Sequence, residues 1–188
     1  MRAYGVRLVV DLRTEAELLR APNPLARTPA PAYINLPLID DPMMLKIDTA
    51  SGMLERYVMM LDERPHSFRA VFELLARTEG AVVVHCFAGK DRTGLVAAMM
   101  LELAGVPHDS IGRDFAESEI HLATRFEEWL AAAAPQRRAA MRDDLRCPPD
   151  RILGALDHVR SRWGGVVGYL EAAGVSPIDI DRLCSKLV

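Results

Sequence analysis

The sequence is poor in cysteine, with three in 188 residues. Cys86, Cys147 and Cys184 are widely spaced, odd in number and form no Cys-x-x-Cys pair. Neither a disulfide framework nor a zinc site is therefore expected. The histidines show no spacing typical of metal ligands either, so we expect no metal and no other cofactor.

Long apolar runs and strong charge are also missing. No stretch reaches the roughly 18 apolar residues of a membrane-crossing helix, and the N-terminus lacks the apolar region of a signal peptide. The formal net charge of −3 gives no general affinity for nucleic acid or for an anionic membrane. We expect no nucleic-acid partner, no integral membrane contact and a cytoplasmic location, with secretion by an unrecognised signal left open.

The residues that are present alternate between strand and helix patterns, which is typical of an α/β domain. A capping box at 14–17 predicts the start of a short helix, and the four prolines within 22–31 predict an extended loop. Strands are expected at 6–11, 33–38 and 81–84, and longer helices at 52–63, 66–78, 94–103, 108–118, 120–134, 135–145, 149–162 and 164–173. The expected fold is one domain, residues 1–188, with a central, mostly parallel sheet flanked by helices and a helical C-terminal half.

Residues 40–78 are a candidate helical lid. Methionines are frequent there and offer an adaptable apolar face that could cover a site, although methionines at helical spacing more often belong to the core; they are Met43, Met44, Met53, Met59 and Met60.

The most informative stretch is residues 85–94, His-Cys-Phe-Ala-Gly-Lys-Asp-Arg-Thr-Gly, between a predicted strand and a predicted helix. Free backbone N–H groups and the helix dipole favour an anion at such a helix N-terminus, and the same field favours the thiolate form of Cys86. The planar guanidinium of Arg92 can bind two phosphate oxygens at once. The loop therefore predicts a site that captures a phosphate and attacks it.

The other loop residues are expected to support this chemistry. Main chain from Phe87 to Lys90 would cradle the phosphate, because Ala88 and Gly89 are small and Gly89 can take positive φ without strain. The Thr93 hydroxyl could assist the sulfur as a leaving group. His85 is expected to orient the loop through a backbone hydrogen bond rather than to transfer protons.

Asp91 is the candidate general acid, because its carboxyl lies inside the loop beside the departing oxygen. It could instead only structure the loop, and four upstream aspartates compete for the role: Asp40, Asp41, Asp48 and Asp62. Lys90 is expected either to add positive charge at the rim of the site, contacting a second acidic group of the substrate, or to be solvated.

These residues resemble the Cys-x5-Arg phosphatases, and among them the bacterial atypical tyrosine phosphatases whose loop reads His-Cys-x-x-Gly-Lys-Asp-Arg-Thr-Gly. The resemblance continues in residues 10–17, Val-Asp-Leu-Arg-Thr-x-x-Glu, in 111–115, Ile-Gly-Arg-Asp-Phe, and in the helix expected from Pro149. It implies a phosphotyrosine-phosphatase-like fold and a cysteine-dependent phosphatase. Members act on phosphotyrosine, and some accept phosphoserine, phosphothreonine or phosphoinositides, so the implied partner is a phosphorylated protein or a phosphoinositide.

The chain departs from this family at its start. Members usually carry an Arg-x-Leu-Gly-Gly segment and a strand before the Asp-Leu-Arg motif, whereas ten residues precede Asp11 here. A shortened N-terminus would expose a sheet edge and favour self-association. The main alternative function is a phosphate-binding or phosphoinositide-binding module that keeps the loop without turnover. A nucleotide-binding P-loop is excluded, because Val84 and Asp91 stand where it needs glycine and Ser or Thr.

Three further charged residues lie within the family motifs. Asp11 and Arg13 are expected to pair in a structural role. Asp114 is expected either to brace Arg92 or to be a surface charge.

Overall fold

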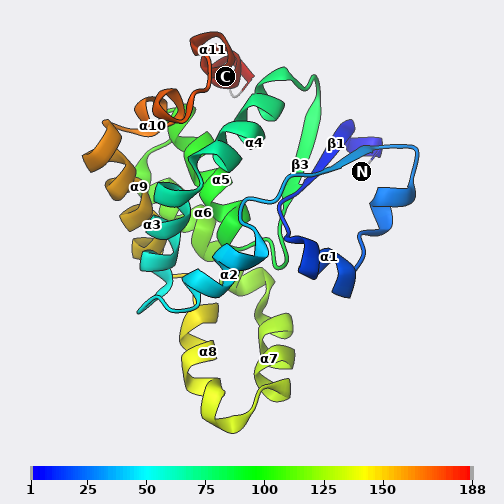
Figure 1. Ribbon diagram of the computed structural model, residues 1–188, viewed down its shortest axis with the longest axis vertical. Coiled ribbons are helices and arrows are strands. Elements are labelled where there is room, and N and C mark those ends of the chain that lie inside the picture. Colours follow the sequence, from blue (N-terminus) through cyan, green and yellow to red (C-terminus); the bar gives the residue numbers. More distant parts are fainter. Residues whose placement is uncertain (1, 187–188) are drawn as a thin grey trace.

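The computed structural model describes residues 2–186 and contains a parallel three-stranded sheet beside a layer of helices (Figure 1). The strands are β1 (Val6–Asp11), β2 (Ala32–Asn35) and β3 (Ala81–His85), in the order β2-β1-β3. Parallel neighbours need long crossover connections, and the chain supplies them as helical segments between the strands. The predicted α/β class, with a parallel sheet flanked by helices, is confirmed.

Helices make up most of the remaining chain. Their bounds are η1 (Arg2–Tyr4), α1 (Glu15–Arg20), η2 (Pro24–Arg27), α2 (Asp41–Ile47), α3 (Met53–Glu63), α4 (Pro65–Arg77), α5 (Asp91–Leu103), α6 (His108–His121), α7 (Ala123–Ala132), η3 (Pro135–Arg137), α8 (Arg138–Leu145), α9 (Pro149–Trp163), α10 (Val166–Ala173) and α11 (Pro177–Lys186). Most of the expected helices appear near their predicted positions, so the helical C-terminal half is confirmed.

Several elements differ from the sequence-based prediction. The strand expected at 33–38 is β2, which ends at Asn35, and the helix expected at 135–145 is divided into η3 and α8. Helix α2 lies in a segment for which no helix bounds were predicted. The expected loop at 22–31 contains the 3-10 turn η2, because the Asn23 side chain accepts a hydrogen bond from Leu25 N at 2.9 Å and starts the turn. Helix α11 was not predicted. Helix α5 begins at Asp91 rather than Gly94, since the Lys90 carbonyl already accepts from Gly94 N at 2.8 Å and adds a turn.

The carboxyl end of β1 lies at the candidate site. Val9 and Val10 of this central strand are fully buried, as its apolar run predicts. The predicted buried strand at 81–84 is only half-buried, because β3 lies at the edge of the sheet. Asp11 is in register with Asn35 on one side and His85 on the other, so the carboxyl ends of all three strands meet where α/β proteins bind ligands.

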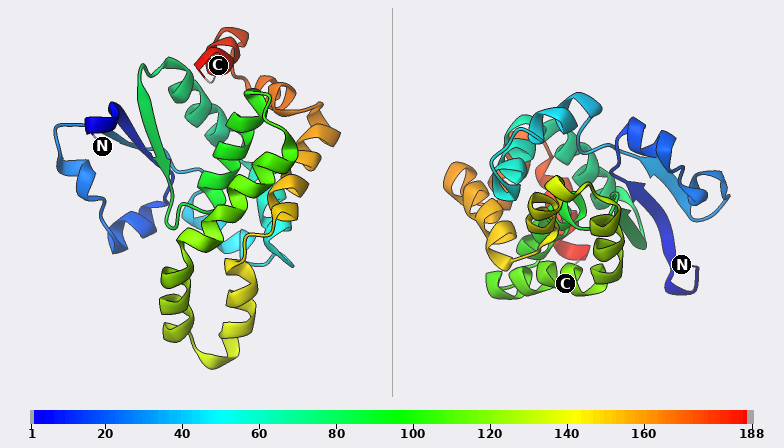
Figure 2. Two further views of the ribbon diagram at one scale, coloured as in Figure 1. Left: turned by 180° about the vertical axis from the view of Figure 1, so that it is seen from behind. Right: turned by 90° about the horizontal axis from the view of Figure 1, so that it is seen from below.

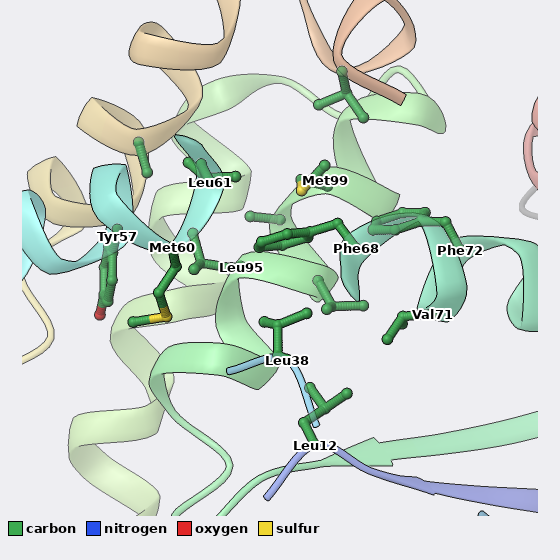
Figure 3. Packing of buried hydrophobic residues seen from close by; sticks show 14 of the residues in the cluster. Leu12, Leu38, Tyr57, Met60, Leu61, Phe68, Val71, Phe72, Leu95 and Met99 are labelled. Carbon is green, nitrogen blue, oxygen red and sulfur yellow. The ribbon is translucent and has the colours of Figure 1, made fainter. Parts of the chain in front are cut away.

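The hydrophobic core extends from the sheet into the space among the helices. Figure 3 shows Leu12 and Leu38 packed beneath side chains of three helices, among them Phe68 of α4 and Leu95 of α5. Figures 1 and 2 show most helices gathered on one side of the sheet, with α1 apart from them, and the pair α7 and α8 projecting as a hairpin. This hairpin extends from the same end of the molecule as the carboxyl ends of the strands.

Candidate active site

The loop after β3 brings the predicted catalytic residues into one cleft. Cys86 is 5 % exposed, and it lines a cleft of about 270 Å³ together with Asp91 and Arg92 from the first turn of α5. Gly89 has φ of 79°, which a side chain would strain. A thiol, a guanidinium and a carboxyl group thus meet at the N-terminus of a long helix.

Arg92 is held by a buried ion pair with Glu17. Its Nη1 and Nη2 donate to Glu17 Oε2 and Oε1 at 2.6 and 2.7 Å, and Nη1 also donates to the Leu12 carbonyl at 3.4 Å. Burial raises the pKa of Glu17, but the hydrogen bonds and charge of Arg92 outweigh this effect and lower it. The carboxylate fixes the plane of the guanidinium, and the N–H groups that it leaves free can meet phosphate oxygens.

Glu17 also completes the predicted capping box of α1, which is confirmed. Its Oε2 accepts from Thr14 N at 2.8 Å, while Thr14 Oγ1 accepts from Glu17 N at 3.3 Å. One carboxylate therefore caps a helix and orients the arginine of the site. The cap was predicted from the sequence, whereas the contact between Glu17 and Arg92 was not. The signal for that contact is the position of the cap, directly after the carboxyl end of β1.

Asp11 is the centre of a buried polar network beside the loop. It accepts hydrogen bonds from Arg13 Nε and Nη2, from Asn23 Nδ2 at 3.0 Å and from the Tyr33 hydroxyl at 3.0 Å. Burial raises the pKa of Asp11, but the hydrogen bonds from Arg13 and Asn23 outweigh it and lower the pKa to about 2. Burial and the Asp11 carboxylate raise the pKa of Tyr33 to about 12.

His85 connects this network to the nucleophile. Its Nδ1 lies 2.9 Å from the Cys86 carbonyl and its Nε2 lies 3.0 Å from Asn23 Nδ2, with Asp11 Oδ2 at 3.5 Å. With Nδ1 protonated, the ring donates to the loop backbone and accepts from Asn23. This is the orienting geometry expected of His85.

Asp91 makes two contacts through the same oxygen. The Tyr57 hydroxyl of α3 donates to Asp91 Oδ1 at 2.5 Å, and Lys90 Nζ lies 3.3 Å from that atom. The Asp91 side chain is 29 % exposed, so it lines the cleft while Tyr57 and Lys90 hold one of its oxygens.

Lys90 does not lie at the rim, as the sequence suggested, and it is not solvated. It is 2 % exposed, and its ammonium donates to the carbonyls of Asp144 and Arg146, at the C-terminal end of α8. Helix C-termini leave carbonyl groups unpaired and attract cations. The lysine therefore ties the phosphate loop to the α7–α8 hairpin.

The carboxyl groups of the described cleft lining are Glu17, Asp91 and Asp144. The four upstream competitors for the acid role lie in other contacts. Asp40 caps α2 and pairs with Arg64, Asp41 accepts from Ala16 N, Asp48 ends α2 and Asp62 pairs with Arg162. Asp144, which faces Arg56 at 3.3 Å, is a cleft carboxylate that the sequence analysis did not consider.

The cleft walls are aromatic and apolar. The exposed ring of Phe87 stacks on Trp129 of α7, with ring centres 5.8 Å apart and an interplanar angle of 29°. Phe126 and Leu145 extend this wall along the hairpin. From the candidate lid region 40–78, the methionines that line the cleft are Met44 and Met53. Met53 also belongs to the buried core, as do Met43 and Met60, while Met44 and Met59 pack partly buried against that core.

Thr93 and Asp114 lie on another side of the loop. Both line a separate pocket of about 500 Å³, which shares Ala88 and Gly89 with the loop. The buried Thr93 hydroxyl has no hydrogen-bond partner among the residues that the structure describes. Since Glu17 is the ion-pair partner of Arg92, the bracing role considered for Asp114 falls to Glu17 instead.

The other two cysteines are free thiols that do not line the cleft. Cys147 is 1 % exposed, and burial raises its pKa to about 11, so it suits the structural role expected of it. Cys184 packs partly buried against the core.

Among residues 2–186, no three His, Cys, Asp or Glu side chains are grouped closely enough to hold a metal ion. Within the same range, no helix has the length and apolar composition needed to cross a membrane.

The whole chain is similar in sequence to known tyrosine phosphatases. Residues 1–188 match a family model described as "Tyrosine phosphatase family". A tyrosine-protein phosphatase of Nostoc commune is 33 % identical over 199 residues, covering 100 % of this chain and 68 % of that protein. The triple specificity protein phosphatase PtpB of Mycobacterium tuberculosis is 32 % identical over 120 residues, covering 57 % of this chain and 44 % of its own length.

Proposed function

Because the chain belongs to the tyrosine phosphatase family, whose members are phosphoric monoester hydrolases, we propose that it hydrolyses phosphotyrosine through a cysteinyl-phosphate intermediate. The observation that carries the proposal is the meeting of Cys86, Arg92 and Asp91 in one cleft at the start of α5. Such a helix start favours both a bound phosphate and a thiolate.

In the first step, the Cys86 thiolate attacks phosphorus while Arg92 and the loop N–H groups bind the non-bridging oxygens. The phosphorus–oxygen bond of the ester breaks and its electron pair leaves with the tyrosine oxygen. Asp91 gives its proton to that oxygen and becomes a carboxylate. The ion pair with Glu17 keeps the guanidinium of Arg92 in place, so little reorganisation is needed as charge develops.

In the second step, the Asp91 carboxylate accepts a proton from water, and the oxygen of that water attacks the phosphorus of the intermediate. The phosphorus–sulfur bond breaks, inorganic phosphate forms and the thiolate returns. Thr93 is predicted to assist the departing sulfur, and its hydroxyl has no hydrogen-bond partner among residues 2–186. No step needs a metal ion.

The aromatic wall supports phosphotyrosine as the main substrate. A phenyl ring reaching the loop would lie against Phe87 and Trp129, which offer flat apolar surface. Phosphoserine, phosphothreonine and phosphoinositides are further candidate substrates, in line with the triple specificity named for the mycobacterial relative. The role of residues 40–78 as a movable cover stays a prediction.

The experiment compares hydrolysis of a phosphotyrosine peptide by the wild type and by Cys86→Ser, Asp91→Asn and Asp144→Asn. We expect no turnover for Cys86→Ser. For Asp91→Asn, a kcat lower by roughly a hundredfold to ten-thousandfold is expected, the usual contribution of general acid catalysis. Asp144→Asn serves as the matched cleft carboxylate and should keep most activity.

A folded wild type that binds inorganic phosphate but hydrolyses none of the phosphomonoesters would favour the non-catalytic binding module instead. Full activity of Asp91→Asn, with activity lost in Asp144→Asn, would move the acid role to Asp144. The same assay with phosphoserine peptide and phosphoinositide substrates measures the breadth of specificity.

A further inference from the structure

The Tyr57 hydroxyl contacts Asp91, the proposed general acid, and makes no other hydrogen bond with residues 2–186. The side chain is fully buried, and its hydroxyl donates to Asp91 Oδ1 at 2.5 Å. Burial, followed by the nearby charge of Asp91, raises the pKa of Tyr57 far above its usual value. The phenol therefore remains a neutral donor throughout the working range of an enzyme.

The position of the Tyr57 ring is fixed by the core. The ring forms a T-shaped pair with Phe115, with ring centres 6.4 Å apart and an interplanar angle of 88°, and Figure 3 shows the ring beside Met60 in the core cluster. Phe115 in turn packs directly on the first turn of α5, where a Cβ on Gly94 would lie 3.0 Å from its ring. The packing of three helices, α3, α6 and α5, thus holds Tyr57 and Asp91 relative to each other.

The two oxygens of Asp91 are treated differently. Tyr57 and Lys90 both approach Oδ1, while Oδ2 accepts no hydrogen bond from residues 2–186. A carboxyl group protonated on Oδ2 still accepts at Oδ1, so the bond from Tyr57 persists whether Asp91 holds a proton or not. This arrangement leaves one oxygen for anchoring and the other for proton transfer.

We propose that Tyr57 is a positioning residue for the reaction: it anchors Oδ1 of Asp91 so that Oδ2 carries the proton to and from the substrate. The inference rests on the proposed role of Asp91 as general acid. A freely rotating carboxyl group would spend part of its time with neither oxygen aimed at the leaving group, and small errors in placement are costly in catalysis. Tyr57 itself does not touch the substrate.

The test is Tyr57→Phe, which keeps the ring and removes only the hydroxyl. The substrates are a series of aryl phosphates whose leaving groups run from good, para-nitrophenol, to poor, phenol and alkylphenols. An acid matters most for a poor leaving group, so we expect kcat to fall about tenfold or more for phenyl phosphate and little for para-nitrophenyl phosphate, with KM unchanged. The ratio of the two rates does not depend on how much of the sample is folded.

Tyr169→Phe is the matched control. That tyrosine is also buried, 1 % exposed, and its hydroxyl donates to the Leu61 carbonyl at 2.9 Å, away from the cleft. If the loss of a buried hydroxyl acted only on the structure, kcat would fall by the same factor for every aryl phosphate in both variants. An unchanged ratio in Tyr57→Phe would therefore overturn the positioning role.

Asp91→Asn, measured in the same series, separates this inference from the proposed function. If the loss of kcat in Asp91→Asn depends on the leaving group and the loss in Tyr57→Phe does not, the positioning role is wrong and the acid assignment stands. If the loss of kcat in Asp91→Asn does not depend on the leaving group, the acid role of Asp91 and the positioning role of Tyr57 are both wrong. In the double variant, Tyr57→Phe should add no further loss to Asp91→Asn, because an anchor has no effect once the acid is absent.

Discussion

The carboxylate of Glu17 contacts both Nη atoms of Arg92, at 2.6 and 2.7 Å, and joins the first helix of the chain to the phosphate loop. Both side chains are only 8 % exposed. The arginine that is proposed to clamp phosphate is therefore oriented by a residue 75 positions away in the sequence.

Replacing Glu17 should damage both stability and activity. Glu17→Gln leaves Arg92 buried without an opposite charge, so we expect a loss of about 3–5 kcal/mol in the free energy of unfolding, measured with urea. The kcat/KM for a phosphotyrosine peptide should fall as well. Thr14→Ala is the control, because it removes the helix cap alone and should cost about 1 kcal/mol with activity kept.

Asp11 should make stability depend on pH only in the acid range. Its pKa is about 2 in the fold against a usual 3.8, so its stabilising contribution is complete above 3.8 and disappears as the pH falls through about 2. The fully buried carboxylate should contribute about 2 kcal/mol. The difference in unfolding free energy between wild type and Asp11→Asn should be constant from pH 7 to 5 and narrow below pH 4; a difference that grows on acidification would contradict this.

Trp129 should contribute to binding of the aromatic substrate. Trp129→Ala removes an aromatic ring from the cleft wall. A pair between this ring and the substrate ring is worth about 0.5–1.5 kcal/mol, so KM for a phosphotyrosine peptide should rise by roughly 2-fold to 12-fold. Inhibition by inorganic phosphate should be unchanged, because phosphate is expected to bind at the loop. Equal KM values for the wild type and Trp129→Ala would show that Trp129 does not contribute to binding of the substrate.

Gly94→Ala should destabilise the protein although alanine favours helices. The propensity gain is at most about 1 kcal/mol, whereas the new Cβ would lie 3.0 and 3.1 Å from two ring atoms of Phe115, and overpacking typically costs about 1–3 kcal/mol. We expect a net loss of about 1 kcal/mol in thermal or urea unfolding. In a Phe115→Leu background the loss should be smaller, since the clashing ring edge is gone.

The features that could be predicted from sequence are those that local patterns determine. The apolar run at 6–11 is β1, the capping box starts α1, and the loop from His85 to Gly94 lies between a strand and a helix. Hydrophobic periodicity and capping are properties of a few neighbouring residues.

The contacts that were missed depend on distant segments meeting. Lys90 is buried because the end of α8 brings unpaired carbonyls over the loop, and neither residue type nor spacing indicates that approach. The partner of Arg92 and the Tyr57 contact with Asp91 arise in the same way, from the packing of α1 and α3 around the start of α5. The half-buried valines of β3 reflect the order of the strands, which periodicity does not reveal.

The central claim is a covalent phosphate on Cys86, and its most direct test is to trap that intermediate. Wild-type protein is mixed with a phosphotyrosine peptide, quenched within the first turnover, digested and analysed by mass spectrometry, with Cys86→Ser treated in parallel. We expect one phosphoryl group on the wild-type peptide that contains Cys86, formed in step with release of the dephosphorylated peptide, and neither adduct nor product with Cys86→Ser. Product release by the wild type without an adduct on Cys86, or sustained turnover by Cys86→Ser, would contradict it.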